Sequence, residues 1–172
     1  WQKKINLVGQ STLNNIWRRH FLDSAQLVQF IPGKTLDIID LGSGAGFPGL
    51  VLAILADCTV RLIESDTRKA EFLRQVIRLT NASASVHCGR IEAYSGSGAD
   101  VIVSRACAPL KNLLEYASVV SHNSSKLLFL KGRSWEMELR ACRMMWHIDY
   151  NYYASCTDPE SAIIEINEFN RI

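Results

Sequence analysis

The sequence predicts an α/β fold in which a mostly parallel, seven-stranded sheet carries helices on both faces and is closed by an antiparallel C-terminal hairpin. Apolar runs of strand length recur along the chain, with helical stretches between them. These runs are continuously hydrophobic, as is typical of strands covered on both faces. The last two runs are joined by a link that is too short for a crossover helix, so we expect them to pair antiparallel.

Five apolar runs account for the parallel part of the sheet. They span residues 36–41, 60–63, 84–87, 101–103 and 127–130. Three helices are expected between them, at residues 50–55, 67–80 and 109–120. The second is amphipathic, and the third places Pro109 in its first turn, where the missing N–H costs nothing.

The two remaining strand-like runs are residues 146–153 and 162–166, linked by the polar segment 155–161. A parallel sheet closed by such a hairpin is the Rossmann-like topology of class I S-adenosylmethionine-dependent methyltransferases. Dinucleotide-binding halves usually lack the hairpin. This argument is an analogy between folds, so residues must decide the function.

A chain of 172 residues fits a single domain. We expect a helical, basic N-terminal part at residues 1–35 and a Rossmann-like core at residues 36–172. The sequence has no apolar run of about 18 residues and no basic-then-apolar leader, which predicts a cytoplasmic protein without membrane contact. We expect this protein to be a monomer. Because the chain begins with Trp1 rather than Met, we expect that a further N-terminal piece precedes it.

Five cysteines show neither Cys-x-x-Cys nor Cys/His ligand spacing. They are Cys58, Cys88, Cys107, Cys142 and Cys156. This pattern predicts no metal site and favours free thiols in a reducing compartment, most of them packed as small apolar side chains.

The net charge of +2 is unevenly distributed. Residues 1–22 carry Lys3, Lys4, Arg18 and Arg19, no acidic residue, and several aromatic residues. Two interpretations stay open for this segment: a surface that faces nucleic-acid phosphates, and the solvated face of an amphipathic helix.

The segment DLGSGAGFPG at residues 40–49 contains a G-x-G-x-x-G pattern, formed by Gly44, Gly46 and Gly49. In dinucleotide sites such glycines meet a pyrophosphate. Here the preceding strand ends in Asp40, whose carboxylate would repel a diphosphate. It would suit S-adenosylmethionine, which carries an ammonium and a sulfonium group.

Glu64 ends the next predicted strand, where an acid can accept hydrogen bonds from ribose hydroxyls. This acid is shared with dinucleotide folds, so Asp40 and the lack of a further substrate domain favour a methyltransferase. Structural roles stay open for both carboxylates: Glu64 as a cap for the helix near Thr67, and Asp40 as a turn cap.

The wider pattern resembles the glucose-inhibited division protein B family (RsmG-type), the bacterial 16S ribosomal RNA guanine-N7 methyltransferases. The matching pieces run in order across nearly the whole chain, at residues 5–7, 19–24, 40–49, 89–92, 104–106, 108–110 and 130–132. The Phe-Pro-Gly ending of the glycine loop and the Arg-His…Asp-Ser element are much more specific than the glycines alone.

The resemblance implies an S-adenosyl-L-methionine pocket and a small-subunit ribosomal RNA substrate. It implies that Gly42 and Phe47 contact the cofactor from the loop, that Ile91 and Glu92 flank the adenine, and that Arg105 lies at the catalytic face. Residues 90–92 and Arg105 follow predicted strands, which places them at the carboxyl edge of the sheet. The loop glycines Gly42, Gly44 and Gly46 would let the backbone turn tightly beside a ligand.

Several cations are candidates for RNA phosphates: Lys3, Lys4, Arg18, Arg19, His20 and, at the end of the fifth strand, Lys131. Arg105 could instead pair with a structural carboxylate. Cys107 is expected to be a packing residue.

Guanine N7 carries an in-plane lone pair that is nucleophilic without losing a proton, so no general base is required. The sequence has neither an Asn-Pro-Pro-aromatic motif nor a cysteine motif for covalent attack. Catalysis would then consist of positioning and fixed dipoles. His20 has arginine neighbours that lower its pKa, yet N7 attack gives it nothing to deprotonate.

Three alternatives remain on the sequence alone. One is a methyltransferase for a protein or small molecule, which would predict no basic N-terminal face. The others are a cofactor-binding module without activity and a dinucleotide oxidoreductase.

Overall fold

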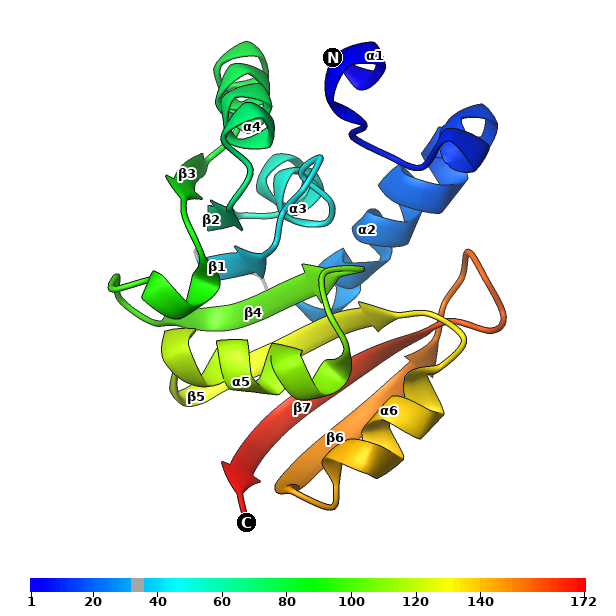
Figure 1. Cartoon of the computed structure of the whole chain (residues 1–172), viewed down its shortest axis with the longest axis vertical. Helices are drawn as coiled ribbons and strands as arrows, with labels where there is room; N and C mark the ends of the chain where they lie inside the picture. Colours follow the sequence, from blue (N-terminus) through cyan, green and yellow to red (C-terminus); the bar gives the residue numbers. More distant parts are fainter. Residues whose placement is uncertain (32–35) are drawn as a thin grey trace.

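The computed structural model describes residues 1–31 and 36–172. Its seven strands form one sheet in the order β3-β2-β1-β4-β5-β7-β6 (Figure 1). They are β1 (Leu36–Leu41), β2 (Cys58–Glu64), β3 (Ala84–Cys88), β4 (Ala99–Arg105), β5 (Ser121–Lys131), β6 (Trp146–Ala154) and β7 (Ala162–Arg171). The first five pair in parallel, and β7 is antiparallel to both β5 and β6. The predicted topology is confirmed.

Helices cover both faces of the sheet, which creates two apolar cores. The helices are α3 (Gly49–Leu55), α4 (Thr67–Thr80), α5 (Leu110–Val120) and α6 (Trp135–Cys142), with a short turn η4 (Ile91–Ala93). Strand residues alternate between the cores. Ile39 and Leu41 of β1 pack with α5 and α6, whereas Ile38 packs with α3 and α4. By this alternation Asp40 lies on the α3 face.

The helix α4 begins and ends where the sequence predicts. Asp66 Oδ1 accepts hydrogen bonds from the backbone N–H groups of Arg68 at 2.8 Å and Lys69 at 3.3 Å, an N-cap that satisfies donors at the helix start. Asn81 ends the helix in the left-handed conformation, with φ 53°. Local chemistry therefore sets both boundaries.

The described N-terminal residues are mostly helical. The segments are α1 (Gln2–Ile5), η1 (Gln10–Asn15), η2 (Trp17–Leu22), α2 (Asp23–Ala25) and η3 (Gln26–Phe30). Leu27 is fully buried and joins the core beside α3. Trp1 packs edge-on against Phe72, with ring centroids 5.7 Å apart, which brings α1 to α4. The rest of the predicted helical part, residues 32–35, lies outside the described residues, and the single-domain assignment stays a prediction.

The five cysteines are free thiols. Cys58 and Cys142 are buried, whereas Cys88, Cys107 and Cys156 are exposed, so the packing interpretation holds for only two of them. Among residues 1–31 and 36–172, no helix is long and apolar enough to cross a bilayer. The same residues contain no cluster of metal-binding side chains.

Candidate functional site

The loop between β1 and α3 depends on its glycines. Gly42, Gly44 and Gly46 have φ values of 67°, 56° and 90°, a region that residues with a Cβ rarely adopt. Space is also lacking at Gly42, because a Cβ there would lie 2.3 Å from the Cys107 sulfur. The loop can therefore pass close to the end of β4.

The Asp40 carboxylate lies beneath this loop. It is fully buried, and its Oδ2 accepts a hydrogen bond from the Gly49 N–H at 3.0 Å. Oδ1 has no hydrogen-bond partner among the described residues. Burial raises the pKa of Asp40 to about 7. Asp40 is not among the residues that line the adjacent cavity. It ties the start of α3 to β1, and its contact with the cofactor stays a prediction.

This buried acid makes stability depend on pH. Because the pKa of Asp40 is about 7 in the folded chain and about 4 in an unfolded one, stability should fall as pH rises from 4 to 7. We expect Asp40→Asn to remove this fall. Relative to the parent, the free energy of unfolding of the variant should increase by about 1 kcal/mol for each unit of rising pH in that range.

Denaturant unfolding at several pH values measures this difference. Asp57→Asn, at an exposed aspartate, is the control. Parallel stability curves for Asp40→Asn and the parent would contradict the assignment.

Glu64 joins two loops through its carboxylate. Its Oε2 accepts the Gly44 N–H and its Oε1 accepts the Asp66 N–H, both at 2.7 Å. Asp66, not Glu64, caps α4. Glu64 is 7% exposed and lines the cavity, and each of its oxygens has a second lone pair for a further donor. Its role toward a cofactor stays a prediction.

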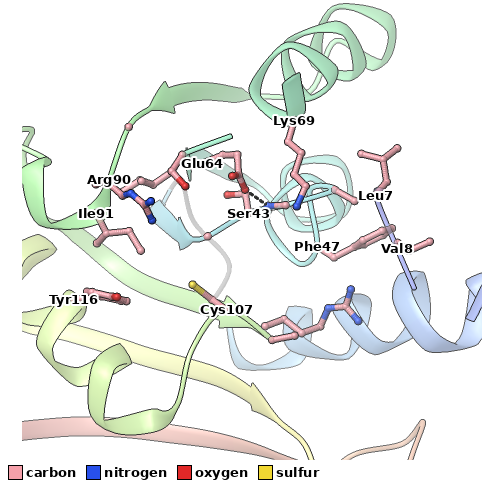
Figure 2. A pocket seen from close by; sticks show the side chains of 18 of the residues that line it. Leu7, Val8, Ser43, Phe47, Glu64, Lys69, Arg90, Ile91, Cys107 and Tyr116 are labelled. Carbon is pink, nitrogen blue, oxygen red and sulfur yellow. Dashed lines mark hydrogen bonds between the residues drawn. The ribbon is translucent and has the colours of Figure 1, made fainter. Parts of the chain in front are cut away.

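A cavity of about 500 Å³ opens at the carboxyl edge of the sheet beside these loops. It brings together most of the predicted cofactor residues: Gly42, Gly44, Phe47, Glu64, Ile91, Glu92 and Arg105. Figure 2 shows Arg90, Ile91 and Tyr116 on one side of it, and Phe47, Leu7 and Val8 on the other. Gly46 does not line the cavity, so its contribution is to the shape of the loop.

Some cavity residues were not predicted. They include Leu7, Val8, Lys69, Tyr116 and Cys107, which was expected to be a packing residue. Lys69 lies in the first turn of α4, and a helix that follows a strand begins at this edge, so its position could have been inferred. Desolvation raises the pKa of the Cys107 thiol, which keeps the thiol protonated near neutral pH.

Arg105, at the end of β4, projects toward the N-terminal helices. Its guanidinium is 2.7 Å from His20 Nδ1, donates to the Arg19 carbonyl oxygen at 3.0 Å, and lies 3.4 Å from Asp23 Oδ2. It also lies over the Phe47 ring, 5.2 Å from the centroid. The ion pair with a structural carboxylate, left open as an alternative for Arg105, is therefore present. The same side chain also lines the cavity.

The comparisons with known proteins agree with this geometry. A family model described as rRNA small subunit methyltransferase G matches residues 1–162. The chain belongs to this methyltransferase family.

Its relatives and structural neighbours fit the assignment. The chain is 46% identical over 171 residues to ribosomal RNA small subunit methyltransferase G of Rhodospirillum rubrum, covering 99% of this chain and 85% of that protein. The corresponding protein of Gluconobacter oxydans is 46% identical over 173 residues, covering 100% and 89%. The predicted family, enzyme class and cofactor are confirmed.

Solved structures of low sequence identity show the fold alone. M. jannaschii TYW2 in complex with AdoMet has a TM-score of 0.67 at 16% identity, covering 99% of this chain and 80% of that chain. A TehB-like SAM-dependent methyltransferase from Corynebacterium glutamicum has a TM-score of 0.67 at 15% identity, covering 92% and 95%. Both support the class I methyltransferase fold.

In this methyltransferase G family member, His20 is an internal, neutral side chain. It is 8% exposed, and burial and the Arg105 charge lower its pKa to about 4. Because Arg105 donates to Nδ1, the proton lies on Nε2, which is 2.7 Å from Thr12 Oγ1. Both ring nitrogens of His20 therefore have partners within the protein, and its contact with RNA phosphates stays a prediction.

Lys131 is also committed to an internal contact. Its Nζ lies 2.7 Å from Glu138 Oε2 and donates to the Ala108 carbonyl at 3.0 Å, and the side chain is 9% exposed. Glu138 in turn accepts the Leu110 N–H. Lys131 therefore connects the end of β5 to α6 and to the segment before α5, and its contact with RNA stays a prediction.

The four remaining basic residues lie at the surface. Lys3 and Lys4 are exposed on α1. Arg18 donates to the Cys156 carbonyl at 3.3 Å, and Arg19 pairs with Asp158 at 2.9 Å. Their contact with RNA stays a prediction.

A second cavity, of about 310 Å³, lies beyond Arg105. It shares His20, Arg105 and Ala106 with the first cavity. Its other side is formed by the end of β5 and by the link between β6 and β7, with Asp23 and Asp158 among its carboxylates. Arg105 and the left-handed Ala106, with φ 51°, therefore form a common wall between two cavities.

Proposed function

We propose that this enzyme transfers the methyl group of S-adenosylmethionine to N7 of a guanine in 16S ribosomal RNA. The observation that carries the proposal is the common wall. Arg105 and Ala106 separate a cavity that suits a nucleoside cofactor from a second cavity that could hold a base. In-line transfer needs two such sites that meet at one point.

The first cavity fits the cofactor in its chemistry. Glu64 offers lone pairs for ribose hydroxyls, and Ile91 offers apolar surface for the adenine beside Glu92. The backbone at Gly42 and Gly44 presents no side chain to a ligand. S-adenosylmethionine supplies an electrophilic methyl group on a sulfonium, and the chain supplies position.

The second cavity suits the target base in its charges. Methylation at N7 leaves the purine with a positive charge, so carboxylates near the base favour the product side of the reaction. Asp23 is held there by Thr157 Oγ1 at 2.6 Å and by Gln26 at 3.0 Å, and it faces Arg105. A fixed carboxylate of this kind needs no reorganisation during transfer.

No side chain is required to remove a proton from guanine N7. His20, the nearest titratable candidate beside Arg105, uses both ring nitrogens within the protein. Its neutral form holds the guanidinium in place, and this supports catalysis by positioning rather than by a general base.

The remaining parts of the proposal concern partners and location. Lys3, Lys4, Arg18 and Arg19 extend the RNA contact over the N-terminal helices, where charge attracts phosphates at low salt. The enzyme acts as a cytoplasmic monomer.

Transfer of labelled methyl groups tests the function directly. The substrate is small-subunit ribosomal RNA from a strain deficient in this methylation, and the modified base is mapped afterwards. We expect one 7-methylguanosine. Binding of S-adenosylhomocysteine without transfer to this RNA, or transfer to another base, would overturn the proposal.

A further inference from the structure

The outer side of the C-terminal hairpin carries a group of aromatic and arginine side chains that the site above does not use. The α6–β6 strip consists of Arg133, Trp135, Arg140, Arg143, Tyr150 and Tyr152. Trp135 and Tyr152 pack against each other in a tilted arrangement, with ring centroids 4.8 Å apart and 36° between the ring planes. Tyr152 is 59% exposed. The strip thus presents an aromatic surface to solvent.

This strip is continuous with the second cavity. Two shallow cavities, of about 460 and 250 Å³, flank the aromatic pair and share Trp135, Glu136 and Tyr152. The larger one shares Ser161 and Ala162 with the second cavity. A ligand could therefore extend from the Arg105 wall onto the strip without leaving the surface.

The position of the strip in the fold leaves it open to a partner. The strand β6 forms the edge of the sheet, and α6 lies beside it (Figure 1). On α6, Leu139 and Cys142 point into the core, and Trp135 packs against the same core. The core therefore supports Trp135, and Trp135 supports the Tyr152 ring that packs on it. From Tyr150 to Ala154 the edge strand extends about 13 Å.

The charges of the strip favour an anionic partner. Arg140 and Arg143 are exposed and form no ion pair within residues 1–31 and 36–172, whereas Arg133 pairs with Glu160. Glu136 is the other carboxylate at these cavities. The strip and its cavities thus have three guanidinium groups and two carboxylates. Two of the three guanidinium groups form no ion pair within the described residues.

We propose that the α6–β6 strip is a second RNA-binding surface, which holds single-stranded nucleotides next to the target base. Bases stack on Tyr152 and Trp135, and phosphates contact Arg140 and Arg143. Stacking on an aromatic ring tolerates any base, and guanidinium groups add phosphate contacts that depend on salt. This inference rests on the proposed function, because it assigns more of the same substrate to the enzyme.

The test compares two double variants of the full chain. Arg140→Ala/Tyr152→Ala removes one exposed cation and one exposed ring from the strip. Arg78→Ala/Leu79→Ala removes an exposed cation and an exposed apolar side chain at the end of α4, and is the matched control. The probe is unmodified 16S ribosomal RNA, titrated at several salt concentrations, and S-adenosylhomocysteine is titrated separately.

We expect the Kd of the strip variant for RNA to be about tenfold higher than that of the parent, since one base stack contributes that much or more. The slope of log Kd against log salt should fall by about 0.7. The Kd for S-adenosylhomocysteine and the Tm should match those of the control. Glu136→Gln should tighten RNA binding, because it removes a negative charge beside the phosphates.

Equal RNA affinity for strip variant and control, while the parent methylates the RNA, would overturn this inference and leave the proposed function standing. Loss of self-association in the strip variant, with unchanged RNA affinity, would identify a protein interface and also overturn it. A parent protein that binds no RNA would overturn both proposals.

Discussion

Replacing Arg105 with alanine is expected to lower the rate of methyl transfer by at least about a hundredfold, as removal of a fixed donor at a reacting centre does. The guanidinium contacts the His20 ring and the Phe47 ring, and it lines both cavities. Without it the wall between the two cavities loses its cation, and Asp23 loses an ion-pair partner. Single-turnover transfer to 16S ribosomal RNA measures the effect.

The Kd for S-adenosylhomocysteine separates a catalytic loss from a folding or binding loss. We expect it to change far less than the rate in Arg105→Ala. Arg105→Lys keeps the charge but not the planar fork, so it should recover only part of the activity. Arg78→Ala is the control for removal of a cation elsewhere. Full methyl transfer by Arg105→Ala would exclude Arg105 from the mechanism.

Gly42→Ala is expected to weaken the binding of S-adenosylhomocysteine about a hundredfold or more. The added Cβ would lie 2.3 Å from the Cys107 sulfur, and alanine is strained at φ 67°. The strained conformation alone costs about 1–2 kcal/mol. The loop or the Cys107 side chain must therefore move, and either movement changes the shape of the cavity that both line. Calorimetric titration with S-adenosylhomocysteine measures the change.

Two further variants identify the cause of this loss. Gly132→Ala is the control, because nothing lies within 4 Å of a Cβ at that position. Gly132→Ala should bind S-adenosylhomocysteine with the same Kd as the parent. Adding Cys107→Ala to Gly42→Ala removes the sulfur but not the backbone strain, so binding should recover in part. Unchanged binding by Gly42→Ala would show that the loop does not need this glycine.

The parts of the fold that local chemistry determines were predictable from the sequence. The predicted ranges 36–41 and 67–80 coincide with β1 and α4, because an unbroken apolar run and a capped amphipathic pattern leave little choice. The helix α6 was missed because only two of its residues, Leu139 and Cys142, are buried, so its sequence lacks the apolar run that reveals the shorter helix α3. The first half of β5 was missed because residues 121–126 are mostly polar. Of these, Ser121 pairs with Ala99 and Lys126 with Val101 of β4, across a shift in register.

The candidate site was predicted in position but only partly in detail. Loop glycines, Glu64 and Arg105 all lie at strand ends, and strand ends of a parallel sheet meet at one edge. The orientation of Asp40 could have been derived, because Ile38 and Asp40 share one face of β1. The partners of His20 and Lys131 could not. They come from other elements of the chain, and no local pattern reports such contacts.

Among the first residues of the chain, some line the cavity and others are exposed to solvent. Leu7 and Val8 line the first cavity, and Lys3 and Lys4 lie exposed a few residues earlier. A polyanion that immobilises the two lysines would also restrain Leu7 and Val8 in the wall of the cavity. Such linkage is reciprocal: bound RNA would tighten the hold on the nucleoside by the same factor by which the nucleoside tightens the hold on RNA.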